Sequence, residues 1–156
     1  MKTVTRLLLT VATLVGGSAR AELPLKAEKT ARVDDHAHFM TVRVQVSNGA
    51  PGRVDGSIRC YSKHALEGFV GSGVLLFKDG RGNIVYKAAT PSVGVNGEYV
   101  GNSDREKLFQ MDLPDLVRDN VASIELECHN TGQDALALAR YNAEALKQLA
   151  ESLLKK

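Results

Sequence analysis

The chain has 156 residues, with 20 Lys and Arg against 18 Asp and Glu, no Trp and only 5% aromatic residues. Lys2, Arg6 and Arg20 fall in a predicted signal peptide, so the rest of the chain is close to neutral. This balance argues against a nucleic-acid binder or an anionic-membrane binder, since such proteins carry a basic surplus on one face.

Residues 1–21 have the three parts of a secretory signal peptide. Lys2 and Arg6 precede an apolar run, and residues 19–21 match an A-x-A cleavage site. The run is shorter than the roughly 20 apolar residues that span a membrane, so we expect no stable membrane insertion. The sequence therefore predicts a periplasmic or secreted protein whose mature chain begins at Glu22.

Residues 22–131 are predicted to form one domain of short β-strands. Residues 23–33 are typical of an extended arm or an edge strand. Residues 40–46 alternate between apolar and polar side chains, which predicts the clearest strand of the chain. In the next predicted strand, Val54, Gly56, Ile58 and Cys60 share one face because the side-chain period of a strand is two.

The middle of the domain is rich in turn signals. Residues 63–72 contain glycines without a dominant period and are predicted to form a loop. Two hairpins are expected after it, around the turns at residues 79–83 and at Asn96-Gly97. A further strand over residues 109–113 ends at Pro114, and the last strand places Ile124, Leu126 and Cys128 on one face.

Seven or eight short strands with no helix-length segment between them predict an antiparallel β-sandwich. Strand phase places Cys60 and Cys128 in its core. In an exported chain, two cysteines most simply form one disulfide. A catalytic thiol or a thiolate metal site is the alternative, although the chain has no C-x-x-C motif.

Two strands with inward cysteines, within residues 39–129, resemble an immunoglobulin-like β-sandwich. The core Trp of antibody domains is missing, and Leu126 stands where a corner Tyr would precede the second Cys. A fibronectin-like sandwich fits equally well. The resemblance is one of fold and implies two packed antiparallel sheets.

A different period begins after Asn130. Thr131 and Asp134 form a capping pattern for an amphipathic helix over residues 132–156. Its Leu and Ala side chains gather on one arc, on which Asn142 intrudes. The helix either packs on the sandwich or pairs with a second copy or a partner, which would make a homo-oligomer.

Two segments carry candidate binding residues. His36, His38 and Met40 alternate, so a strand would project them to one face, where they suit copper, or zinc with an oxygen from Asp34 or Asp35. The competing interpretation places Met40 in the core.

The second segment is the predicted hairpin, with binding candidates Asn96, Gly97, Tyr99 and Val100, because Tyr is favoured at binding surfaces. Alternatively, Tyr99 packs on its own sheet. No catalytic residue is predicted, since Gly71-Ser72-Gly73 lacks the first Gly of a nucleophile elbow.

The sequence thus predicts an exported non-enzymatic protein that binds another macromolecule, in the first place a protein, as inhibitors, immunity proteins and envelope adaptors do. A periplasmic copper- or zinc-binding protein is the alternative.

Overall fold

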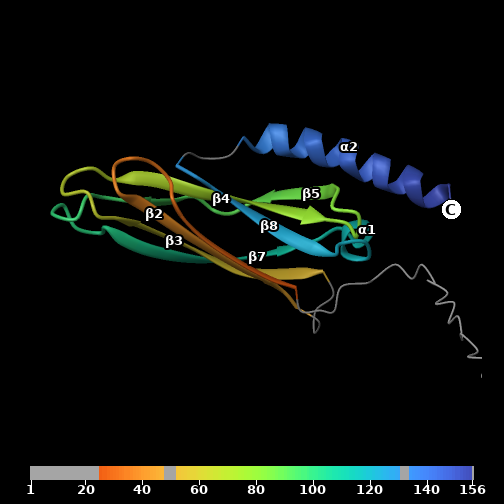
Figure 1. The fold of residues 1–156 in the computed structure, drawn as a ribbon, viewed down its shortest axis with the longest axis horizontal. Coiled ribbons are helices and arrows are strands. Elements are labelled where there is room, and N and C mark those ends of the chain that lie inside the picture. Colours follow the sequence, from red (N-terminus) through yellow and green to blue (C-terminus); the bar gives the residue numbers. More distant parts are fainter. Residues whose placement is uncertain (1–24, 48–51, 131–133, 156) are drawn as a thin grey trace, which may run out of the picture.

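The computed structural model describes residues 25–47, 52–130 and 134–155. Within these residues, eight strands form two antiparallel sheets of four strands each, packed face to face, with a long helix outside one of them (Figure 1). The predicted β-sandwich with a C-terminal helix is confirmed. The predicted signal peptide lies outside the described residues.

The first sheet has the strand order β1-β2-β3-β7. Its strands are β1 (Lys26–Arg32), β2 (His38–Val46), β3 (Arg53–Ser62) and β7 (Asp104–Asp112). The predicted N-terminal arm is therefore an edge strand. The other edge, β7, carries mostly charged side chains, which discourage pairing with another chain.

The second sheet is built around β4 (Phe69–Lys78). On one side, β4 pairs with β6 (Val93–Val95) at its start and with β5 (Ile84–Ala89) further along. On the other side it pairs with β8 (Ser123–His129). A short helix, α1 (Asp115–Arg118), precedes β8.

Alternating apolar side chains fill the space between the sheets. The buried positions on the first sheet include Met40, Val42, Val54 and Ile58, which are all 0% exposed. Burying each such side chain contributes roughly 1.5–3 kcal/mol. The inward phase predicted for the two cysteine strands is confirmed, because Cys60 is 0% exposed and Cys128 packs against the same core.

The predicted disulfide is not formed in the structure, where both cysteines are free thiols. Cys60 lies on β3, and the backbone N–H of Gly71 on β4 donates a hydrogen bond to its sulfur. Cys128 pairs with Gly73 on β4. The two cysteines thus lie on opposite sheets, each beside a glycine of the same strand, β4.

The prediction of a loop over residues 63–72 is wrong after Gly68, because β4 already begins at Phe69. Gly71 and Gly73 are strand residues whose missing side chains make room for the opposite sheet. A Cβ at Gly71 would lie 2.6 Å from Cys60 Sγ, and one at Gly73 would lie 3.0 Å from Val42 Cγ2.

The hairpin predicted at Asn96-Gly97 is also wrong. β6 ends at Val95, and the next strand, β7, pairs with β3 in the other sheet. The segment 98–100 is a turn, closed by a hydrogen bond from the Val100 N–H to the Gly97 carbonyl. The N–H groups of Glu98 and Tyr99 donate to the preceding loop at residues 64 and 65 instead of to β6.

The long helix α2 (Ala135–Leu154) confirms the predicted helix, with Asp134 rather than Thr131 as its N-cap. The Asp134 side chain accepts hydrogen bonds from the N–H groups of Leu136 and Ala137. Thr131 lies outside the described residues. No helix in the described part of the chain is both long and apolar enough to cross a membrane.

The hydrogen bonds of Asn142 explain why a polar residue stands on the apolar side of α2. Its Oδ1 accepts from the Lys87 N–H at 2.8 Å, and its Nδ2 donates to the Lys87 carbonyl at 2.7 Å. The side chain therefore pairs with the free edge of β5 as a neighbouring strand would. Leu149, about two turns further along α2, is buried, and α2 packs on the sandwich along β5.

Candidate functional site

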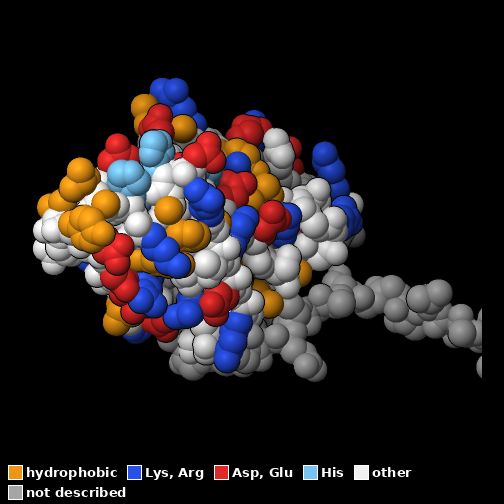
Figure 2. Space-filling view, turned by 60° about the vertical axis from the view of Figure 1, so that its left-hand side comes forward, with side chains coloured by type: hydrophobic (Ala, Val, Ile, Leu, Met, Phe, Trp, Pro, Cys, Tyr) orange, Lys and Arg blue, Asp and Glu red, His pale blue; other side chains and the backbone are white. Residues whose placement is uncertain are grey.

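Three connections meet at one end of the sandwich, on the left in Figure 1. They are the β1–β2 turn (residues 33–37), the β3–β4 loop (residues 63–68) and the β6–β7 loop (residues 96–103). Figure 2 brings this end forward and shows hydrophobic side chains beside histidines. Exposed apolar side chains and histidine side chains are thus neighbours at this end.

The β3–β4 and β6–β7 loops are joined through their backbones. Glu98 N donates to the His64 carbonyl at 2.8 Å, and Tyr99 N donates to the Ala65 carbonyl at 2.9 Å. Gly97 is buried against Leu66, where a Cβ would lie 2.3 Å from the Leu66 carbonyl carbon. Glycine at 97 is therefore required by the close approach of the loops.

Three apolar side chains on these loops face outward. Tyr99 is 81% exposed, Leu66 is 70% exposed and Val100 is 59% exposed. We call these residues the tip surface. The alternative prediction, that Tyr99 packs on its own sheet, is wrong. Of the other predicted binding residues, Asn96 is exposed and Gly97 is a spacer between the loops.

A shallow hollow of about 470 Å³, lined by apolar and polar groups, lies close to the tip surface, where β4 and β6 pair. Val70 is 48% exposed there, because Gly94 beside it has no side chain. Arg105 borders the hollow and donates a hydrogen bond to the Gly94 carbonyl at 3.1 Å. The exposed apolar area at this end is thus larger than the tip surface alone.

Below the loops, His38 is the centre of a buried polar network. Its Nδ1 lies 2.7 Å from Asp34 Oδ2, and its Nε2 lies 3.2 Å from the Glu67 carbonyl oxygen. The ring also stacks on Phe69 at 4.7 Å between centroids. Both nitrogens face acceptors, so His38 holds the β1–β2 turn and the β3–β4 loop together.

Asp34 is the charged partner in this network. Burial acts to raise the pKa of its carboxyl, but hydrogen bonds from the side chain of His38, the N–H of His36 and the side chain of Asn130 outweigh burial. The pKa is therefore lowered from its usual value, and Asp34 connects the turn to the end of β8.

Asp34, His38 and Ser62 are neighbours, as in an Asp-His-Ser set. However, Ser62 Oγ donates to the Glu67 carbonyl at 2.9 Å and accepts from the His64 N–H at 3.1 Å. A nucleophile must instead be hydrogen-bonded to its base. The present hydrogen bonds hold the β3–β4 loop in place.

The predicted set of His36, His38 and Met40 does not converge. Met40 is 0% exposed in the core, and both nitrogens of His38 are engaged in the buried network. His36 lies in the turn outside β2 and is brought to His64 and Glu67 instead.

Within that new group, His36 Nδ1 lies 2.9 Å from Glu67 Oε2, and His64 Nε2 lies 3.9 Å from the same oxygen. The sequence offered no signal for this meeting, since the turn and the loop come together only through the pairing of β2 with β3.

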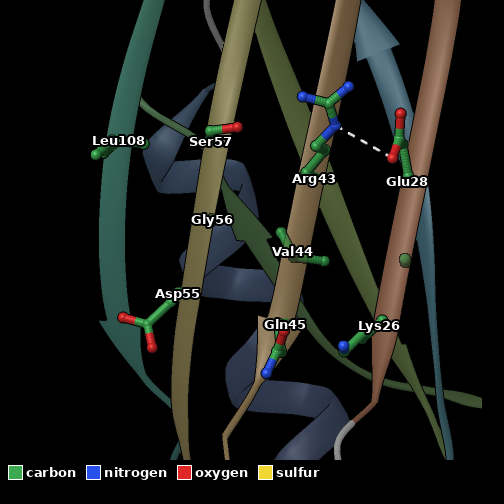
Figure 3. Close-up of a pocket in the computed structure, with 10 residues that line it drawn as sticks. Lys26, Glu28, Arg43, Val44, Gln45, Asp55, Gly56, Ser57 and Leu108 are labelled. Atoms are coloured by element: carbon green, nitrogen blue, oxygen red, sulfur yellow. Dashed lines mark ion pairs between the residues drawn. The ribbon is translucent and has the colours of Figure 1, made fainter.

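A second, shallow hollow lies on the outer face of the first sheet (Figure 3). The small Ser57 leaves space between Arg43 and Leu108, and Arg43 points towards Glu28 with an Nε to Oε2 distance of 3.1 Å. The charged groups pair along the sheet and do not converge on a common point. This face is therefore a weaker candidate for a binding site than the loop end.

Comparison with known proteins finds no protein family whose model matches the chain, no matching curated protein and no matching solved structure.

Proposed function

We propose that this protein is an exported, non-enzymatic β-sandwich that binds another protein through the tip surface. The observation that supports the proposal is the exposure of Leu66, Tyr99 and Val100 on two loops whose backbones are joined. Loops held in one conformation lose little further entropy when a partner binds.

The chemistry of the tip surface favours a protein partner. Tyr99 offers a large rigid contact area with few torsions to immobilise, and a hydroxyl that can hydrogen-bond at the rim of an interface. Leu66 in the β3–β4 loop and Val70 near the start of β4 add apolar area. Apolar anchors surrounded by polar side chains are typical of protein interfaces.

The proposal rests on the loops and not on membership of a sandwich family. An immunoglobulin domain has strands A, B, E and D in one sheet and strands C, F and G in the other, so its second and third strands belong to different sheets. Here the first three strands are neighbours in one sheet, β1-β2-β3. The shared feature is a set of loops at the end of a sandwich.

A site-specific crosslinker tests the proposal in the cells that make the protein. A photoreactive side chain at Tyr99 should give one reproducible protein adduct in the cell envelope, and Leu66→Ala should reduce its yield. The control is the same side chain at Leu108, which is 77% exposed on the sheet face. Equal adducts at both positions, or no protein adduct at Tyr99, would reject the proposal.

We further propose that Cys60 and Cys128 form a disulfide after export. Each thiol would lose its hydrogen to an oxidising disulfide, which is reduced in turn. The proposal is supported by their positions on opposite sheets beside Gly71 and Gly73.

The thiols also give a pH test. Burial, with a further contribution from Cys128, raises the pKa of the Cys60 thiol from 9.0 to about 11, although the hydrogen bond from Gly71 opposes the rise. The contribution of the Cys60 thiol to the stability of reduced protein should be constant well below pH 9.0 and fall as pH rises towards 11, since in this range the thiol ionises only in the unfolded chain.

The total loss should be about 3 kcal/mol, measured by urea denaturation with reductant. Reduced Cys60→Ser protein corrects for other groups that titrate there. Protein purified without reductant should lack the loss and show no free thiol by mass spectrometry. Two free thiols in exported protein would reject the disulfide.

A further inference from the structure

We infer that His36, His64 and Glu67 form a metal site that takes Zn²⁺. One ligand atom from each residue lies within 4.8 Å of those of the other two. This inference goes beyond the proposed function, because it requires no protein partner and involves side chains outside the tip surface.

The spacing suits a tetrahedral ion. Zinc ligands at bonds of about 2.0–2.2 Å lie roughly 3.3 Å apart in this geometry. Glu67 Oε2 is 2.9 Å from His36 Nδ1 and 3.9 Å from His64 Nε2, so small side-chain rotations bring all three to one ion. Two imidazoles and a carboxylate, without a thiolate, are a usual zinc set that leaves a position for water.

The two segments that carry the ligands are already fixed to each other. His38 bridges Asp34 and the Glu67 carbonyl, and Ser62 Oγ donates to the same carbonyl at 2.9 Å. Lys63 N donates to the Ala37 carbonyl at 3.0 Å. A metal would therefore bind without first ordering the turn or the loop, which favours affinity.

This network also assigns a role to the buried histidine. His38 is 3% exposed and uses both nitrogens, so it supports the backbone beneath the site and is not a ligand. Metal ligands are commonly positioned in this way by neighbouring residues that do not touch the ion.

Zinc binding must move a proton on His64. In the free protein, His64 Nδ1 accepts from Glu67 N at 2.9 Å, so the ring proton is on Nε2. When Nε2 binds zinc, it releases this proton to water, and Nδ1 takes one up. The N–H groups of Leu66 and Glu67, which both donate to Nδ1 in the free protein, then lose this acceptor; both residues are exposed to water.

His36 undergoes the same exchange. Its Nδ1 faces the Glu67 carboxylate and gives up its proton to bind the ion, while the other ring nitrogen holds one. The side chain is 59% exposed, so water is available for both transfers. The net result at each ring is a neutral imidazole with one nitrogen on the metal.

Calorimetric titration of untagged, chelator-treated full-length protein with Zn²⁺ alone tests the site. One ion per chain should bind with a dissociation constant tighter than about 10 μM, and His36→Ala, His64→Ala and Glu67→Gln should each weaken binding roughly tenfold or more. Glu67→Gln retains the backbone groups that fix the loop, so its loss of affinity does not arise from unfolding.

Two variants serve as controls. His129 lies 3.3 Å from Glu127 Oε2 in a comparable His-Glu pair elsewhere, so His129→Ala should leave the affinity unchanged. Met40→Leu should also leave it unchanged, which separates this site from the set expected from sequence. Nitrogen NMR of His64 should show the proton moving from Nε2 to Nδ1 as zinc binds.

The site is overturned by absence of binding up to about 100 μM Zn²⁺. It is equally overturned if binding survives His64→Ala or Glu67→Gln, or if the His64 proton stays on Nε2 in the zinc-loaded protein. Circular dichroism of each variant must match that of the unmodified protein, and Glu67→Gln decides the result if a histidine variant unfolds.

Discussion

The edge of β5 and the tip surface are both places where a sandwich meets solvent, but the chain completes only one of them. Along β5, Asn142 pairs with both backbone groups of Lys87, and α2 covers the edge. At the tip, the loop backbones are also paired, yet Leu66 and Tyr99 remain largely exposed.

A region can have all its backbone hydrogen bonds made and still leave apolar side chains exposed. In both regions the backbone hydrogen bonds are made, as a strand edge or a close pair of loops requires. At the tip, three neighbouring apolar side chains, Leu66, Tyr99 and Val100, stay exposed on loops whose backbones are joined. The helix that covers apolar surface lies elsewhere, which favours the tip as the surface offered to a partner.

The largest effect should come from the covered edge. Asn142→Leu leaves the N–H and carbonyl of Lys87 without partners beneath α2 and should lower the free energy of unfolding by about 3 kcal/mol. Urea denaturation measures the loss. Gln148→Leu, which affects only a contact with Glu144 on the helix surface, should change stability by less than about 0.5 kcal/mol. Equal losses would show that Asn142 does not complete the edge.

The next largest loss of stability should come from a substitution that forces the two loops of the tip apart. Gly97→Ala forces a methyl group against the Leu66 backbone and should cost about 2 kcal/mol. Hydrogen exchange of the Glu98 and Tyr99 amides should accelerate. Gly80→Ala is the control, because a Cβ at Gly80 meets nothing within 4 Å. Unchanged exchange in Gly97→Ala would mean that the loops do not depend on this contact.

The smallest expected change in stability comes from replacing a tyrosine by alanine in each of the two regions. Tyr141 donates to the Ile84 carbonyl at 3.3 Å, and Lys87 Nζ lies 4.1 Å from the centre of its ring. Tyr141→Ala should therefore cost about 1 kcal/mol. Tyr99→Ala should change stability by less than about 0.5 kcal/mol in thermal unfolding. A larger loss at Tyr99 would make it a structural residue.

Strand phase could be predicted from the sequence because it is a local property. The alternation around Val42, Ile58 and Leu126 assigns each side chain to a face before any partner strand is known. The amphipathic helix could be predicted for the same reason. Its N-cap differs by three residues, since the Asp134 side chain reaches the first N–H groups directly.

The remaining features depend on contacts between distant segments. In the sequence, Gly71 and Gly73 are typical of a loop. Only their contacts with Cys60 and Val42 of the other sheet show why a strand has glycine there. Asn142 looks misplaced until the edge of β5 is beside it. His64 and Glu67 meet His36 only because the ends of β2 and β3 bring the turn and the loop together, and neither segment has a pattern that reveals this.

The joining of the loops has a mechanical consequence. The β3–β4 loop connects the two sheets, and the β6–β7 loop bonded to it does the same. A pull on the tip surface is therefore divided between strands of both sheets and directed along their axes. Such a force shears the antiparallel β2–β3 ladder, in which many hydrogen bonds must break together, and does not peel one edge bond by bond.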